Sequence, residues 1–154
     1  MDYLVVKWLH ILFSTLLFGT GLGIAFFMWM AHLRGDVRVI AGVARLVVIA
    51  DAMFTAPAVL IQLATGLWLV HRSGLPLQVH WLALALVLFV LVGACWLPVV
   101  WMQIRIRDLA VGAVARSEPL PQRYYTLMRA WFILGWPAFF GVLAIFWLMV
   151  VKPA

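Results

Sequence analysis

The chain has 154 residues, of which 68% are hydrophobic and only 10% are charged, and its formal net charge is +6. Soluble domains are about half apolar and about a quarter charged, so this composition excludes a soluble globular domain and indicates a protein surrounded by membrane lipid. The basic residues stand between apolar runs rather than on one polar face, which excludes nucleic acid as a partner. Cys95 is the only cysteine and lies inside an apolar run, so neither a disulfide framework nor a thiolate metal cluster is expected.

Four apolar runs follow one another along the chain, each longer than the roughly 20 residues that a helix needs to cross a bilayer. Because backbone polar groups in lipid must be satisfied within the segment, these runs predict helices rather than strands. We expect the helices at about residues 4–33, 39–71, 78–110 and 122–151. The connections are short and contain glycine or proline, so consecutive helices are predicted to be antiparallel neighbours. The predicted fold class is all-α, a four-transmembrane-helix antiparallel bundle that forms a single integral membrane domain over residues 1–154.

The basic residues are distributed unevenly between the two ends of this bundle. The first and third connections, with their flanks, hold Arg34, Arg38, Arg45, Arg105, Arg107, Arg116, Arg123 and Arg129. The other end holds Lys7, Arg72 and Lys152. Because cytoplasmic loops carry the excess of Lys and Arg, both termini are predicted to lie on the outer side, the periplasm in a Gram-negative cell. The expected location is therefore the bacterial inner membrane, with several passes.

The first helix begins with Lys7 and His10, which share a helix face that Ser14 continues one turn deeper. In one interpretation Lys7 snorkels to lipid headgroups and His10 is an interfacial polar residue. In the other, His10 is an axial ligand of haem iron inside the bundle, since imidazole is the usual proximal ligand and bundle cores commonly hold cofactors. Lys7 would then meet a haem propionate.

The second helix carries a polar stripe. Asp51, Thr55, Gln62 and Thr65 fall at helical spacing on one face, which must point at the bundle interior if the other faces meet lipid. A charged Asp51 near the bilayer centre costs about 2.5–3.5 kcal/mol, so it is expected to be protonated or paired.

The sequence leaves open how Asp51 is satisfied. One alternative is a buried ion pair with Arg45 or Arg105, and the other is a proton relay that includes Gln62, or a substrate contact. Pro57 is expected to kink the second helix and to free backbone carbonyls.

Two further histidines, His71 and His80, flank the second connection. Either they are solvated at the membrane surface, or one of them is a second iron ligand, with His80 the better placed. No Walker loop, GxSxG, HExxH or CxxC motif occurs, so hydrolytic, nucleotide-driven and zinc chemistry have no support.

Several short motifs carry a resemblance to known membrane families. The opening "KWLHI" is similar to the start of the HemJ-type protoporphyrinogen oxidases, and the likeness continues through "APAVLIQLATGLWL", "RDLA", "RYYTLM" and "VVKP". The stretches "GTGLGIAFF", "CWLPVVW" and "GWPAF" resemble more closely an uncharacterised family of predicted small bacterial integral membrane proteins. The CopD-type copper-resistance membrane proteins are a more distant relative in architecture.

The resemblance implies a b-type haem with His10 at the family's histidine position. HemJ-type proteins also carry a lysine early in the third helix and a histidine near its middle, where this chain reads "WLALALVLF" and "GACWLPVV" with neither. The resemblance therefore leaves two alternatives: a haem protein without porphyrinogen oxidation, or a protein that has lost both.

The leading functional prediction is a haem-b-binding inner-membrane redox protein, active in electron transfer or in porphyrinogen- or oxygen-linked oxidation. His10 is the axial ligand, quinone or porphyrin is the expected partner, and Asp51 and Gln62 guide protons. One alternative is a non-catalytic membrane subunit or scaffold, as a homo-oligomer or in a larger membrane complex. Another is a small metal or solute transporter that uses the Asp51 stripe.

Overall fold

The computed structural model describes residues 1–153, and these residues are helical except at short connections. The elements are α1 (Asp2–Arg34), α2 (Val37–Ala50), η1 (Asp51–Thr55), α3 (Ala56–Ser73), α4 (His80–Arg116) and α5 (Gln122–Val151). Because α2, η1 and α3 follow one another without a break, the chain has four helices long and apolar enough to cross a membrane. The predicted all-helical class and the four spans are confirmed.

The first three spans begin and end at residues that differ from the predicted limits, and two of these differences have an identifiable reason. The second span begins at Val37 because the side chain of Asp36 accepts hydrogen bonds from the backbone N–H groups of Arg38 (2.8 Å) and Val39 (3.3 Å). The α4 helix continues to Arg116, six residues beyond the predicted end. Alanine is the strongest helix former, and the packing of Ala110 and Ala113, both 0% exposed, holds this extension in place.

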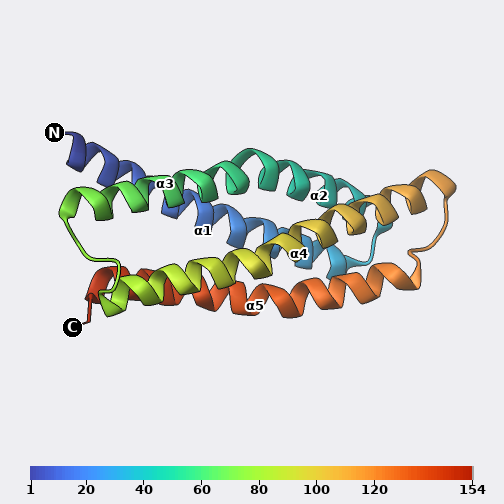
Figure 1. Cartoon of the computed structure of the whole chain (residues 1–154). Helices are drawn as coiled ribbons and strands as arrows, with labels where there is room; N and C mark the ends of the chain where they lie inside the picture. Colours follow the sequence, from blue (N-terminus) through green and yellow to red (C-terminus); the bar gives the residue numbers. More distant parts are fainter. Residues whose placement is uncertain (154) are drawn as a thin grey trace.

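The four spans form an elongated bundle with both termini at the same end (Figure 1). We call this the terminal end; it also holds the connection at 74–79, whereas the connections at 35–36 and 117–121 form the loop end. The α4 helix packs along α5 and also against α2, while α1 packs against α3 and α2.

The buried apolar core lies in the half of the bundle nearer the loop end. Four elements contribute to it: Met28 and Ala31 from α1; Ile40, Ala41, Ala44 and Val47 from α2; Val99, Met102, Ile106 and Ala110 from α4; and Tyr124, Met128 and Trp131 from α5. No residue of α3 belongs to this cluster. Toward the terminal end, α1 packs on α3, and α5 packs on α4. Side-chain contacts such as the one between Phe18 and Phe139 join α1 to α5.

Large apolar side chains cover the outside of the bundle. Leu60 is 70% exposed, Val90 68% and Leu97 65%, and each lies within a helix long enough to span a bilayer. A continuous apolar exterior of this kind is stable only in a non-aqueous surrounding.

The second span contains one π-helical turn, Asp51–Thr55, just before Pro57. The backbone N–H of Ala56 bonds to the carbonyl of Asp51, five residues back, and Pro57 has no N–H to donate. One extra residue in a turn rotates the following face by about 100°. The kink expected at Pro57 therefore takes the form of a π turn, which divides the predicted polar stripe. Asp51 and Thr55 are buried beside α4 side chains, whereas Gln62 and Thr65 contact α1.

The contact between α4 and α5 depends on Gly141. A Cβ atom at this position would lie 2.5 Å from Cγ2 of Val92, a stiff β-branched side chain. At Gly135, in the same helix, a Cβ atom would meet no atom within 4 Å.

We expect Gly141→Ala to destabilise the protein by about 1–3 kcal/mol through overpacking. Gly135→Ala is the matched control, and it should be neutral or slightly stabilising because alanine favours helix. Thermal unfolding in mild detergent, followed by tryptophan fluorescence, measures both. Equal midpoints for the two variants would contradict the close approach.

Candidate functional site

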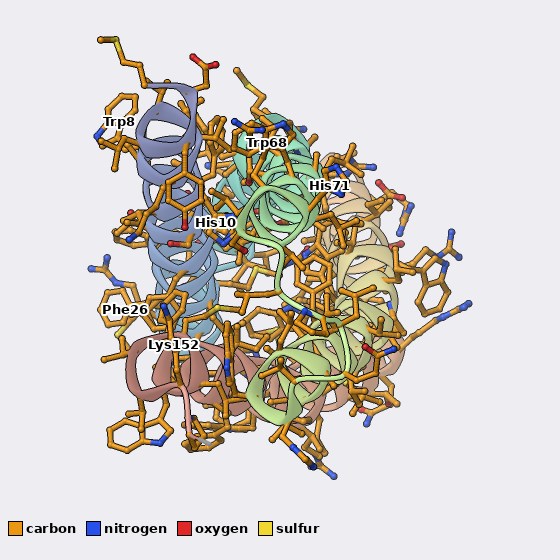
Figure 2. The ribbon with its side chains drawn as sticks, turned by 60° about the vertical axis from the view of Figure 1, so that its left-hand side comes forward. Trp8, His10, Phe26, Trp68, His71 and Lys152 are labelled. Carbon is orange, nitrogen blue, oxygen red and sulfur yellow. The ribbon has the colours of Figure 1, made fainter. Side chains whose placement is uncertain are left out.

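His10 lies between α1 and α3 and is held by two side chains of α3. Its Nδ1 atom is 2.8 Å from Oγ1 of Thr65, and its Nε2 atom is 3.0 Å from Nε2 of Gln62. Figure 2 shows the His10 side chain directed from α1 toward α3. The imidazole is half-buried, and both of its nitrogens have partners on the neighbouring helix.

The hydrogen bonds of Thr65 and Gln62 indicate which nitrogen of His10 carries the proton. The Thr65 hydroxyl donates to the carbonyl of Ile61 at 2.6 Å, so its oxygen accepts from Nδ1–H of His10. The Nε2 atom then carries the lone pair and accepts from the Gln62 amide. The imidazole is therefore fixed with Nε2 as its basic nitrogen.

Gly66 provides the space for this ring. A Cβ atom at Gly66 would lie 3.1 Å from Cε1 of His10, closer than nearly all real Cβ contacts. The stretch Gln62 to Gly66, "QLATG", thus supplies two polar partners and one gap on the face that meets α1. The sequence placed Gln62 and Thr65 on an inward face but gave no sign that they meet His10, because that contact joins residues more than fifty positions apart.

The other residues predicted around His10 are not gathered there. Lys7 is exposed one turn earlier, and the hydroxyl of Ser14 donates to the carbonyl of Ile11 at 2.7 Å on its own helix. His71 and His80 are both exposed, and Figure 2 shows His71 on the side of α3 away from α1. Within residues 1–153, neither histidine forms a hydrogen bond with His10, so the structure does not place a second nitrogen ligand beside it.

Asp51 occupies a separate polar cluster between the second span and α4. It is 3% exposed and lies beside the side chains of Thr55, Gln103 and Trp96. Thr55 is 5% exposed and Gln103 is 2% exposed. Only the packing of the second span against α4 brings Gln103 and Trp96 to Asp51.

The ion pair considered for Asp51 is not formed. Arg45 and Arg105 are both exposed, and the only ion pairs in the described part of the chain join Arg107 to Asp108 and Arg116 to Glu118. Long arginine side chains extend toward a polar surface more readily than into an apolar interior. The proton path expected from Asp51 to Gln62 is also divided, because Gln62 bonds to His10 on the other side of the π turn.

A third polar contact, not predicted, lies at the loop end. Nδ1 of His32 is 3.1 Å from the hydroxyl of Tyr124, which is 1% exposed. The rings of Trp29, His32, Tyr124 and Tyr125 pack around it. This contact links α1 to the first turn of α5, and its only sequence signal was a histidine near the end of an apolar run.

No group of three or more His, Cys, Asp or Glu side chains gathers anywhere in residues 1–153. The two candidate sites each contain one titratable side chain, His10 in one and Asp51 in the other.

A family described as "Predicted integral membrane protein (DUF2269)" matches residues 4–153 of the chain. The chain belongs to this family. Searches of curated proteins and of solved structures gave no match. The predicted membership of an uncharacterised membrane-protein family is thus confirmed, whereas the resemblance to HemJ-type and CopD-type proteins stays a prediction.

The His10–Thr65 hydrogen bond should contribute measurably to stability. Hydrogen bonds between helices of membrane proteins contribute on average about 0.6 kcal/mol and at most about 1.7 kcal/mol. We therefore expect His10→Ala and Thr65→Val to be non-additive in a double-mutant cycle of thermal unfolding, by about this amount. Thr126→Val is the matched control, since Thr126 bonds only to a carbonyl of its own helix. If the losses of stability from His10→Ala and Thr65→Val simply add in the double variant, the result would argue against the contact.

Proposed function

We propose that this DUF2269 protein is a haem-b-binding membrane redox protein in which Nε2 of His10 is the axial ligand. The observation that supports it is the hydrogen bond from Nδ1 of His10 to Thr65 at 2.8 Å. Ligating histidines commonly donate their second ring N–H to an oxygen, which fixes the tautomer and raises the basicity of the ligating nitrogen. Thr65 performs this function for His10.

The residues at His10 fit an axial ligand with one change. The Gln62 amide covers Nε2 at 3.0 Å, so it must rotate away before that nitrogen can bind iron. The rotation costs the one hydrogen bond to Nε2, about 0.6 kcal/mol, since Oε1 of Gln62 is buried without a hydrogen-bond partner and has none to lose. When bound, the haem would supply one-electron chemistry or oxygen chemistry.

Other residues of the chain would orient His10 and bind the haem. Thr65 accepts the hydrogen bond from Nδ1–H of His10, and Gly66 leaves room for the imidazole ring of His10. Lys7 is exposed one turn toward the terminal end, and in this proposal it would pair with a haem propionate. Because His71 and His80 lie apart from His10, the proposed ligation uses one histidine of this chain. A quinone or porphyrin dissolved in the bilayer is the electron partner that suits a site within a span.

We further propose that the four spans form an antiparallel bundle in the bacterial inner membrane, with both termini on the outer side. The support is the basic residues: eight of them lie at or near the loop end, as named above, against three toward the terminal end.

Cysteine labelling tests this orientation. In a Cys95→Ser background expressed in a Gram-negative host, Leu75→Cys at the terminal end should react with an impermeant maleimide in cells with an opened outer membrane. Glu118→Cys at the loop end should react only after the inner membrane is permeabilised. Both positions are exposed, so burial does not confound the comparison. The reverse pattern would overturn the orientation.

A second candidate function is a non-catalytic membrane subunit or scaffold. It is favoured by the saturation of His10, whose two nitrogens both have partners from α3, as expected for a clamp that sets helix register. The two candidates differ in what happens when Gln62 is removed.

Absorption spectroscopy tests the haem proposal. Wild-type protein, extracted in mild detergent or reconstituted with hemin, should show a Soret band with about one haem per chain. His10→Ala should lose the band, while the matched variants His71→Ala and His80→Ala keep it because these side chains lie away from His10. A colourless reconstituted wild type, or a His10→Ala variant of undiminished colour and intact fold, would contradict the proposal.

The Gln62→Leu variant separates the two candidates. Under the haem proposal it removes the group that competes for Nε2, so haem affinity should rise by roughly threefold if the lost hydrogen bond contributes about 0.6 kcal/mol. Under the scaffold alternative it lowers the unfolding temperature and hemin still does not bind.

A further inference from the structure

The cluster around Asp51 contains buried oxygen atoms that form no hydrogen bond within the described residues. Oδ2 of Asp51, Oγ1 of Thr55 and Oε1 of Gln103 are each buried and without a hydrogen-bond partner in the described chain. All three side chains are at least nine-tenths buried, and Asp51 lies beside the other two. Buried polar atoms are nearly always paired in folded proteins, so three unpaired oxygens at one place indicate a missing partner.

No side chain of this protein supplies the positive charge. Within residues 1–153 no Lys, Arg or His forms an ion pair with Asp51 from α2, η1, α3 or α4, and Arg45 and Arg105 are exposed. A carboxylate in an apolar span without a counter-charge is strongly unfavourable. The site is therefore stable only with one added positive charge, carried by a proton or by a metal ion.

A cavity lies beside this site. It has a volume of about 220 Å³ and includes Asp51, Gln103 and Trp96 in its lining. The remaining lining is apolar and comes from Val48, Ala52, Ala56, Val100 and Ile104. Asp51 and Gln103 thus bring a carboxylate and an amide to an otherwise apolar cavity within the spans.

Pro57 leaves one backbone carbonyl of the π turn without its helical donor. After Ala56 donates to the carbonyl of Asp51, the next donor along the chain would be residue 57, which is proline and has no N–H. A carbonyl at Ala52 or Met53 therefore lacks its helical donor, and Ala52 lines the cavity. In transporters, unwound backbone carbonyls of discontinuous helices coordinate sodium ions.

We propose that Asp51, Thr55 and Gln103 form an exchange site for one small monovalent cation, in which a sodium ion displaces the proton of Asp51. Oxygen ligands suit a hard cation. One carboxylate balances one positive charge, whereas a divalent ion would leave an uncompensated charge in the apolar span. As the ion enters, the carboxyl proton leaves, so the net charge of the site does not change.

The site shares no residue with the His10 site, and it is separated from it by the π turn. A failure of haem binding at His10 leaves this inference standing, and the reverse also holds.

Dicyclohexylcarbodiimide provides the test, because this apolar reagent modifies protonated carboxyl groups that it reaches from an apolar phase. Full-length protein in mild detergent should be labelled at Asp51 in choline chloride, as located by peptide mass spectrometry. Sodium chloride at ten times its dissociation constant should slow labelling about tenfold, because about one site in eleven then still holds the proton. The exposed Asp108 and Glu118 are internal controls and should stay unlabelled.

Variants identify the oxygen ligands. Gln103→Leu and Thr55→Val keep the acid and should still be labelled, but sodium should protect them severalfold less. Gln78→Leu, an exposed amide in the connection at 74–79, should behave as wild type. Labelling of wild-type Asp51 that sodium and choline affect equally would overturn the cation site. Absence of labelling under all conditions would also overturn it, since the neutral, accessible acid would not exist.

Discussion

The arrangement of this protein depends on one constraint: a polar group inside an apolar span must find its partner within the protein. The chain carries few such groups, and three sets of them lie where two helices meet. His10 joins α1 to α3, the cluster of Asp51 and Gln103 lies between the second span and α4, and His32 with Tyr124 joins α1 to α5. Water competes weakly for such groups inside a bilayer, so these few contacts set which helix faces meet.

The π turn at Asp51–Thr55 has two effects on how the polar groups of the second span find partners. It rotates the second half of the span, so that one helix presents polar groups first to α4 and then to α1. The π turn also lies just before Pro57, whose missing N–H would interrupt the hydrogen bonds of a regular α-helix at the same place. A single local irregularity thus allows two chemically different sites on one helix.

The two sites differ in how far their polar atoms are satisfied. At His10 both ring nitrogens have partners, and only Oε1 of Gln62 lacks one. At Asp51 three oxygens form no hydrogen bond. Satisfied groups fix helix register, whereas buried groups without a hydrogen bond are candidates for binding a ligand or a proton. This difference is the reason that the two proposals treat the His10 site and the Asp51 site separately.

Sequence alone determined the helical class, the four spans and their approximate limits, because apolar length and the need to satisfy backbone groups in lipid are properties of each segment by itself. It also identified His10 and Asp51 as the unusual polar residues. The sequence did not identify the residues that surround these two side chains, which are Thr65 and Gly66 at His10 and Gln103 and Trp96 at Asp51. The single stripe predicted from a regular 3.6-residue period failed because a π turn changes the phase of the helix between Thr55 and Gln62. Which faces meet depends on packing between residues distant in the chain, and that information exists only once the helices are assembled.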